Sequence, residues 1–164
     1  WIGLRWKPLT DANLVLEGSR MVKLGDSARN DWMVRASFSR EEGTDMKVDR
    51  RSWPMWRLYG DASYILDDQQ TFGVLDFRAG RSFALSADGL TVASMFGGAG
   101  LNYDSALGDP EAIGAGPGVS IRRWFRETYH AAPRSFVDLT VEYRFRLAGG
   151  ERAEGLFATL SVNY

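Results

Sequence analysis

Charged side chains recur on one side of the strand-like segments, and they are the residues best placed to do chemistry. The set is Arg35, Asp61, Asp76, Arg78, Arg122, Arg126, Asp138, Glu142 and Arg144. Successive side chains of a β-strand point to opposite faces, so these residues share the polar faces of their segments. In a membrane barrel a polar face lines the lumen. The charges then either line a channel that passes a polymer or pair with one another and rigidify a narrow lumen, and both interpretations stay open.

Aromatic side chains lie on the same polar faces. They are Tyr59, Trp124, Phe136 and Phe157. Their rings could stack on sugar rings, as the track of a polysaccharide exporter would require. The alternative is that they fill space inside the fold, which is the commoner role of an inward aromatic side chain.

The sequence offers no constellation for catalysis. Asp138 and Glu142 are about 13 Å apart by strand rise, which is too far for the carboxylate pair of a glycosidase. The single histidine, His130, has no serine motif or second base beside it, and 114–118 (GAGPG) is not followed by the GK[ST] of a phosphate loop. With no cysteine and one histidine, we expect no metal site, no cofactor and no enzyme activity.

Composition narrows the classes of partner. The chain has 164 residues, enough for one domain, and a formal net charge of −1, which gives no electrostatic basis for binding nucleic acid. Glycine, at 18 residues, and aromatic residues, at 13%, are both abundant. This balance favours an all-β chain.

The last ten residues, 155–164 (GLFATLSVNY), have the clearest strand pattern. Apolar Leu156, Ala158, Leu160 and Val162 alternate with residues of the other face, and the segment ends at Tyr164. About ten residues is also the length that a tilted strand needs to cross the hydrocarbon of a bilayer. The segment is therefore typical of the closing strand of an outer-membrane barrel.

Period-two alternation recurs along the chain and no helical period competes with it. It predicts nine strands, at 1–7, 13–24, 31–39, 55–66, 71–83, 90–103, 116–126, 135–146 and 155–164. The polar segment 40–53 and the segment 104–115, rich in Gly, Asp and Pro, are predicted loops. The glycines of 97–100 (GGAG) indicate a bulge or close packing inside a barrel. The sequence thus predicts an all-β antiparallel up-and-down meander.

The meander could form either a soluble sandwich or an outer-membrane β-barrel. In a sandwich the apolar faces pack together, whereas in a membrane barrel they meet lipid. Aromatic residues near strand ends on the apolar faces favour the barrel: Trp32, Phe38, Trp56, Tyr64, Tyr143 and Tyr164. We expect about eight to ten strands in this chain, within a barrel that it either closes alone or shares with strands upstream, because single-chain bacterial barrels have even counts. The alternative is a soluble all-β sandwich that acts as a carbohydrate- or protein-binding module.

Three segments carry a resemblance to a known family. They are GLRWKPLTDANLVLEG, DWMVRASFS and GAGPGVSIRRWFRETYHAAPRSFVDLTVEYRFRL. Together they resemble the C-terminal domain of the phage adsorption protein A (NfrA) family. The similarity runs over nearly the whole chain, and 114–147 is its most specific part.

The resemblance implies a location and a set of partners. Residues 1–164 would be the outer-membrane β-barrel domain of a longer Gram-negative protein whose periplasmic part carries tetratricopeptide-like repeats. Its partners would be outer-membrane lipid, a secreted polysaccharide, phage and that periplasmic repeat domain, with functions in exopolysaccharide export and phage adsorption. By resemblance to outer-membrane proteins generally, Tyr164 would be the signal read by the assembly machinery. The family implies no catalytic residue.

Overall fold

The computed structural model of the protein describes residues 1–9, 13–25, 30–47, 49–125 and 135–163. These residues form nine β-strands and one short 3-10 helix: β1 (Ile2–Leu9), β2 (Leu14–Met21), β3 (Asp31–Glu42), β4 (Ser52–Ile65), β5 (Gln70–Ala84), β6 (Thr91–Asp104), β7 (Glu111–Phe125), β8 (Ser135–Gly149), η1 (Glu151–Ala153) and β9 (Gly155–Asn163). No helix in the described part of the chain is long and apolar enough to span a membrane. The predicted all-β antiparallel meander is confirmed.

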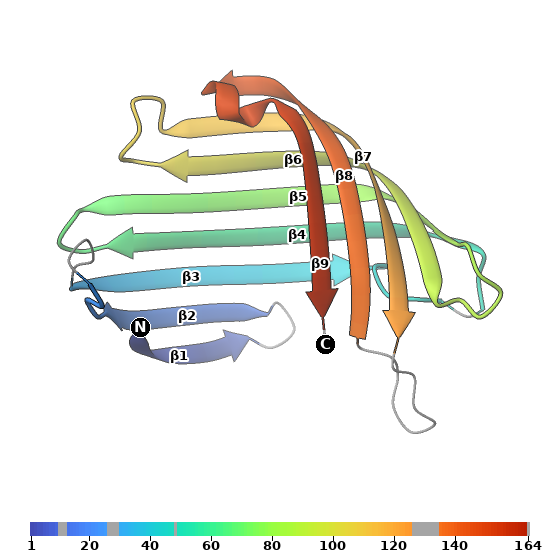
Figure 1. The fold of residues 1–164 in the computed structure, drawn as a ribbon, viewed down its shortest axis with the longest axis horizontal. Coiled ribbons are helices and arrows are strands. Elements are labelled where there is room, and N and C mark those ends of the chain that lie inside the picture. Colours follow the sequence, from blue (N-terminus) through green and yellow to red (C-terminus); the bar gives the residue numbers. More distant parts are fainter. Residues whose placement is uncertain (10–12, 26–29, 48, 126–134, 164) are drawn as a thin grey trace.

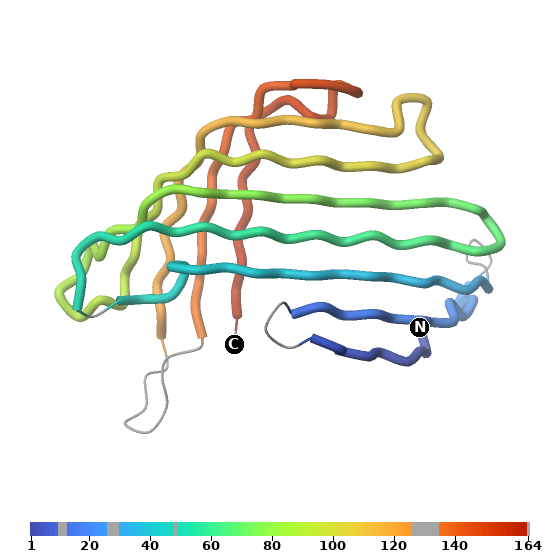
Figure 2. Tube along the Cα trace, turned by 180° about the vertical axis from the view of Figure 1, so that it is seen from behind, coloured from blue at the N-terminus to red at the C-terminus, as the bar shows by residue number. Residues whose placement is uncertain are grey.

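The strands form one sheet in chain order, from β1 at one edge to β9 at the other, and every neighbouring pair is antiparallel. Figures 1 and 2 show that the sheet curls, so that β8 and β9 cross the direction of β2 to β5. The sheet is not closed, since β1 and β9 are not paired in the described residues. The connections between strands lie at two opposite rims of the curled sheet. The N-terminal rim is the one at which β1 begins, and the C-terminal rim is the one at which β9 ends.

Several strands extend beyond their predicted ends, and β2 is shorter than predicted, since it ends at Met21 and not at residue 24. Strand β3 continues to Glu42, which pairs with Trp56, so the predicted loop 40–53 shrinks to 43–51. Strand β7 begins at Glu111, inside the predicted loop 104–115, and β8 continues to Gly149. Backbone hydrogen bonds of a ladder do not require apolar side chains, so hydropathy alone misses these ends.

Glycines on the inner face allow the sheet to curl. Asp76 of β5 faces Gly100 of β6, and Gly100 faces Gly114 of β7. A Cβ at Gly100 would lie 2.0 Å from Nη1 of Arg144, a side chain that reaches back from β8. Within 97–100 the packing is thus close at Gly100 but open at Gly97, and the β5–β6 pairing shows no register shift there.

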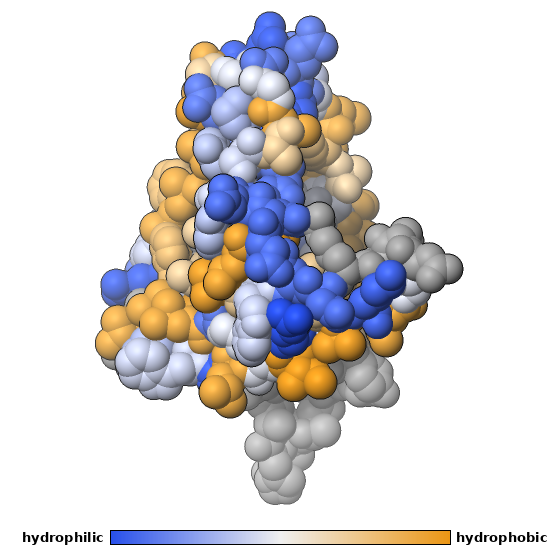
Figure 3. Space-filling view, turned by 90° about the vertical axis from the view of Figure 1, so that its left-hand side faces the viewer, coloured by the Kyte–Doolittle hydropathy of each residue, from blue (hydrophilic) through white to orange (hydrophobic). Residues whose placement is uncertain are grey.

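The two faces of the sheet differ in burial as well as in polarity. Large apolar side chains of the outer face are exposed, among them Leu4, Trp6, Trp32, Val34, Leu75, Phe77, Met95, Val119, Ile121, Leu139, Phe145, Leu156, Leu160 and Val162. Figure 3 views the molecule from the N-terminal rim, with hydrophilic residues along the middle and hydrophobic residues on both flanks. The buried apolar side chains lie mainly on the inner face and include Trp53, Met55, Val92, Phe96 and Trp124.

Candidate functional site

The inner face is built from cross-strand rows of polar residues. One row consists of hydroxyl side chains from five successive strands: Ser82, Ser94, Ser120, Thr140 and Thr159. The hydroxyls of Ser82 and Ser94 are buried and lie 2.8 Å apart, within hydrogen-bonding distance. Buried hydroxyls are tolerated when they are hydrogen-bonded, so this face can remain polar although water does not reach much of it.

The largest group of charges joins β5 to β8. Nη2 of Arg144 lies 2.5 Å from Oδ2 of Asp76, and Nε of Arg78 lies 3.2 Å from Oδ1 of the same carboxylate. Glu142 completes the group, because its Oε2 lies 3.3 Å from Nη2 of Arg78 and its other oxygen pairs with Arg144. The four side chains are between 4% and 18% exposed. We call them the four-charge cluster; its two cations and two anions cancel.

The four-charge cluster exists because the strands between its members carry glycine. The carboxylate of Asp76 and the guanidinium of Arg144 are separated by 68 residues and by the two strands β6 and β7. A Cβ at Gly118 of β7 would lie 2.5 Å from the ring of Phe96 and 2.9 Å from Cβ of Glu142. Side chains at such positions would hold β5 and β8 apart.

A second group surrounds Arg122 on β7. Its Nε lies 2.9 Å from Oδ2 of Asp138, whose other oxygen accepts a hydrogen bond from Oγ1 of Thr140 at 2.7 Å. The guanidinium also lies over the ring of Phe136, 4.3 Å from the centroid, and 5.5 Å from that of Trp124. Two inward aromatics thus contact a cation that is already paired.

The β3–β4 connection reaches this inner face. Nη1 of Arg122 donates to the carbonyl oxygen of Thr44 at 3.2 Å. The carbonyl of Gly43 accepts from Nε1 of Trp53 at 2.8 Å and from the hydroxyl of Ser82 at 3.4 Å. The β3–β4 connection is therefore attached to the sheet at the C-terminal rim by hydrogen bonds from side chains of the sheet to backbone carbonyls of the connection.

Ion pairs become more exposed toward the β1 edge. Arg35 pairs with Asp61 at 2.6 Å, and the hydroxyl of Tyr59 donates to the same carboxylate at 3.2 Å. Beyond them, Arg5 pairs with Glu17 at 2.8 Å, with the Arg5 side chain 66% exposed. The inner face is thus enclosed at β5 to β8 and open at β1 to β3.

Most of the predicted lumen-lining residues come together on this face as pairs. Eight of them are described, namely Arg35, Asp61, Asp76, Arg78, Arg122, Asp138, Glu142 and Arg144, and each has an opposite charge within 4 Å. Arg126, like the assembly-signal candidate Tyr164 and like His130, lies outside the described residues. Pairing is the arrangement expected of a rigid lumen, whereas the lumen-lining role itself stays a prediction.

The four predicted sugar-stacking residues contact charges of the same face. Trp124, only 5% exposed, packs edge-on against Phe136, with ring centroids 5.1 Å apart. Phe157 lies under Arg144, at 5.4 Å, and is 37% exposed. Burial leaves Trp124 little surface for a sugar, so stacking on a polysaccharide stays a prediction that suits Phe157 better.

Sequence reasoning missed two parts of this face. Arg5 and Glu17 were not among the candidates, although the alternation of their strands places both on the polar side. The carbonyls of Gly43 and Thr44 could not have been found, because a backbone acceptor leaves no mark on residue type. The described residues contain no group of three or more potential metal ligands. The absence of enzyme activity stays a prediction.

One carboxylate outside the strands has a perturbed pKa. Asp88, in the β5–β6 connection, accepts hydrogen bonds from the Ser86 hydroxyl and from the backbone N–H of Leu90, and Arg123 lies 3.5 Å away. These donors hold the pKa of the Asp88 carboxyl below its ordinary value, and the Ser86 hydroxyl makes the largest contribution.

Fold and site together define a class: an antiparallel β-meander with an exposed apolar outer face and a paired, polar inner face. Residues 1–160 match the family described as Bacteriophage N adsorption protein A C-term, and the chain belongs to that family. The resemblance to this family in the sequence is confirmed. No curated protein and no solved structure matched the chain in the corresponding comparisons.

Proposed function

We propose that this chain is an outer-membrane β-barrel domain that serves at the cell surface in phage adsorption. The observation that carries the proposal is the inverted distribution of side chains, in which the apolar face of the sheet is exposed and the charged face is enclosed. A water-soluble sheet buries its apolar face, and an exposed apolar surface of this extent is unusual for a soluble monomer. In a bilayer the same surface meets lipid at no cost.

The outward charges support a lipid-facing band, because they lie near strand ends. The outward cations Arg40, Arg81 and Arg123 are all near the C-terminal rim, and Arg20 is at the N-terminal rim. Between Thr71 and Ala79 the outer face of β5 carries no charge. That segment measures about 26 Å along the strand and about 20 Å along the membrane normal at a 40° tilt, close to the apolar band of known barrels.

The sandwich alternative does not fit this fold. A sandwich needs two sheets packed through their apolar faces, whereas the described strands form one sheet whose apolar face is exposed. A soluble binding module would therefore leave its most hydrophobic surface in water.

We further propose that the barrel contains strands beyond these nine. Neighbouring strands are antiparallel, so all odd-numbered strands point the same way. The two edge strands, β1 and β9, are therefore parallel to each other in direction. Closing the sheet with antiparallel pairs only requires an odd number of additional strands between them. Lipid cannot hydrogen-bond the two free edges, so a membrane-resident sheet has to cover them.

Membrane residence is tested by an arginine placed at two depths on one face of β8. In the full-length parent protein, Leu139→Arg should cost about 2 to 4 kcal/mol, because Leu139 lies within the apolar band, and Leu147→Arg about 0 to 1, because Leu147 lies near the rim. Leu139 is outward and 49% exposed, and Leu147, which lies at the register shift between β7 and β8, is 66% exposed. The readouts are outer-membrane fractionation, heat-modifiable migration and unfolding in detergent. Recovery of the wild type as a stable, detergent-free monomer would end the proposal.

The phage-adsorption proposal is supported by the name of the family. It places the C-terminal rim in the periplasm, where the assembly machinery would read the final strand. The β6–β7 connection, 105–110, then faces the cell exterior, and the β5–β6 connection, 85–90, faces the periplasm. Connections carry binding functions more readily than the strands that hold them.

An epitope-tag experiment tests this arrangement. A tag inserted between Leu107 and Gly108 should bind antibody on intact cells and reduce phage adsorption, whereas a tag beside Ala87 should do neither until the cells are permeabilised. If phage adsorbs to cells that lack the protein as fast as it adsorbs to wild-type cells, the protein is not the receptor. Staining of intact cells at Ala87 alone would reverse the proposed orientation.

Polysaccharide export is the second function we propose. It draws support from the open inner face at β1 to β3, where Arg5 is 66% exposed, rather than from the enclosed four-charge cluster. Loss of secreted polysaccharide in a strain with Arg5→Ala and Arg35→Ala, with outer-membrane yield unchanged, is the expected result. Normal secretion in cells that lack the protein would exclude this function.

A further inference from the structure

The chain turns sharply where it leaves β3. Gly43 has a φ of +70°, and a Cβ at this position would lie 2.1 Å from the carbonyl oxygen of Pro54 in β4. Glycine fits a backbone that is both left-handed and this close to a neighbouring strand, whereas a larger residue does not. The chain can therefore leave the β3–β4 ladder abruptly after Glu42, and we call the five residues that follow, 43–47, the strap.

Side chains from three strands hold the strap on the inner face. Nε1 of Trp53, in β4, donates to the carbonyl of Gly43 at 2.8 Å, and the hydroxyl of Ser82, in β5, donates to the same oxygen at 3.4 Å. Nη1 of Arg122, in β7, donates to the carbonyl of Thr44 at 3.2 Å. The strap is thus anchored both beside its own hairpin and on β7, which lies two strands beyond β5 in the sheet.

The inner face near these anchors is buried. Trp53 is 2% exposed and Ser82 is 1% exposed, and Val92 of β6, which pairs in register with Arg122, is 4% exposed. The inner side of a single sheet has no second layer, so side chains that faced a wide, water-filled opening would be exposed to water. The strap supplies a cover where β5 to β7 reach the C-terminal rim.

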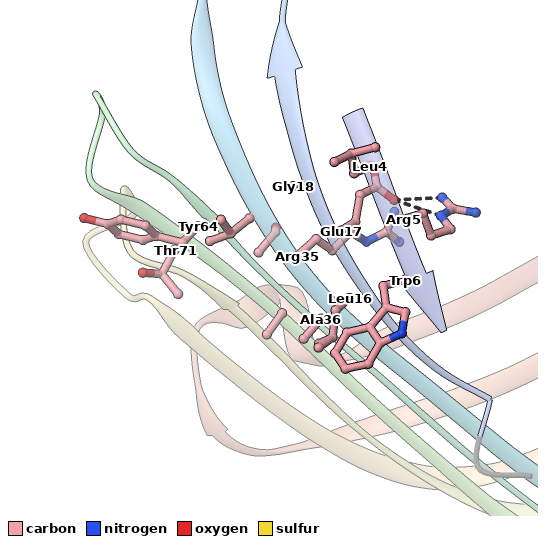
Figure 4. Close-up of a pocket in the computed structure, with 13 residues that line it drawn as sticks. Leu4, Arg5, Trp6, Leu16, Glu17, Gly18, Arg35, Ala36, Tyr64 and Thr71 are labelled. Atoms are coloured by element: carbon pink, nitrogen blue, oxygen red, sulfur yellow. Dashed lines mark hydrogen bonds and ion pairs between the residues drawn. The ribbon is translucent and has the colours of Figure 1, made fainter. Parts of the chain in front are cut away.

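The inner face is open on the opposite side of the sheet. Figure 4 shows the paired Arg5 and Glu17 directed away from Leu16 and Trp6 of the outer face. The Arg5 side chain is 66% exposed. A solute that crosses a barrel built on this sheet therefore has room beside β1 to β3, and the strap restricts the room beside β5 to β7.

We propose that the strap is a gate at the C-terminal mouth of the barrel lumen. Docked on the inner face it narrows the mouth, and released it leaves a wider opening, because the diameter of a pore limits what passes. Trp53 and Arg122 are the positioning residues, since both donate to the strap from strands of the sheet. The inference rests on the proposed membrane residence and adds a means of controlling passage.

The way the strap is held suits a part that moves. The pairing of β3 with β4 ends at Glu42 and Trp56, and the strap is docked beyond it by hydrogen bonds from side chains. Each such hydrogen bond makes only a modest net contribution to stability. Segments held in this way open at a lower free energy than the strands beneath them, so the strap can leave while the sheet stays folded.

Single-channel recording of the full-length protein in planar bilayers tests the gate. Trp53→Phe removes the donor to Gly43 and keeps a ring in place, and Arg122→Lys keeps a cation beside Asp138 and removes the guanidinium that reaches Thr44. Each variant should increase the population of a wider, higher-conductance state about fivefold, the factor that corresponds to about 1 kcal/mol for one hydrogen bond. The double variant should increase it further.

Tyr59→Phe is the matched control. It also removes one aromatic donor from the inner face of β4, but that donor pairs with Asp61 at 3.2 Å and not with the strap. The frequency of the wider state should therefore remain that of the wild type. Heat-modifiable migration of every variant checks that the barrel is folded.

A second measurement leaves the anchors intact. Thr44→Cys, modified with a bulky charged maleimide, should lower the conductance, because the added group lies in the mouth. The same modification at Ala87→Cys, in the β5–β6 connection of the same rim, should not.

Other outcomes overturn the inference. A lower unfolding temperature with unchanged conductance in Trp53→Phe and Arg122→Lys would make the strap a structural connection only. Unchanged conductance after modification at Thr44 would place the strap outside the path of ions. An inserted protein that conducts neither as wild type nor as the double variant would contradict this inference alone. One that is stable without detergent would contradict the proposed function as well.

Discussion

Replacing Arg144 by Met removes the cation that bridges Asp76 and Glu142 and leaves two carboxylates with one guanidinium, that of Arg78. The side chains involved are mostly buried, at 12% exposed for Arg144, 18% for Asp76 and 4% for Glu142. Breaking a buried ion pair by removing one partner costs about 3 to 5 kcal/mol. Because water reaches part of Asp76, we expect Arg144→Met to cost about 3 kcal/mol.

The double variant makes the prediction quantitative. Asp76→Asn alone leaves two cations with Glu142 and should also cost about 2 to 3 kcal/mol. Asp76→Asn with Arg144→Met leaves the neutral pair of Arg78 and Glu142, at 3.3 Å. The double variant should therefore cost about as much as one single variant, which corresponds to a coupling energy of about 2 kcal/mol or more.

The assay is equilibrium unfolding in denaturant of protein refolded in detergent, as a double-variant cycle. A second cycle, on Arg5 and Glu17, is the matched control, because that pair lies on the same inner face with Arg5 66% exposed. Its coupling should be about 0.2 to 1 kcal/mol, the range of exposed pairs. Equal coupling in the two cycles would mean that water fills the lumen at β5 to β8 and that the burial argument is wrong.

Further predictions concern packing, the last strand and one turn. Gly118→Ala should destabilise the protein by about 1 to 3 kcal/mol, because its Cβ would meet the ring of Phe96, whereas Gly97→Ala, with nothing within 4 Å, should be neutral or stabilising; denaturant unfolding compares them. Deletion of 155–164 should abolish folding, since it leaves β8 unpaired in lipid; a heat-modifiable, protease-resistant product at normal yield would show that β9 is dispensable. The pKa of the Asp88 carboxyl is lowered in the folded protein, so the stability that this carboxylate gives the β5–β6 turn is fully present at pH values above the ordinary pKa of an aspartate. That stability is lost as the pH falls through the lowered pKa of the folded state. A carboxyl NMR titration of Asp88 with an ordinary midpoint would contradict this prediction.

Much of the fold followed from local periodicity. Strands alternate side chains with period two whatever their partners are, so the run from Val137 to Phe145 revealed both its strand and its two faces. The number of strands and the membership of eight charges on one face were predicted in the same way. The polar strand ends at Glu42 and Glu111 were missed, because backbone ladders extend where hydropathy gives no signal.

Other features were decided only by the tertiary structure. Asp76 and Arg144 are 68 residues apart and meet because the sheet curls over glycine-bearing strands, so their pairing depends on register and curvature and not on spacing. The same holds for Arg122 and the carbonyl of Thr44, which are 78 residues apart. The sequence by itself determined which residues share a face, since alternation is a local property of the backbone. Which of them touch, and which remain exposed, was settled by how far the sheet curls and where it stops.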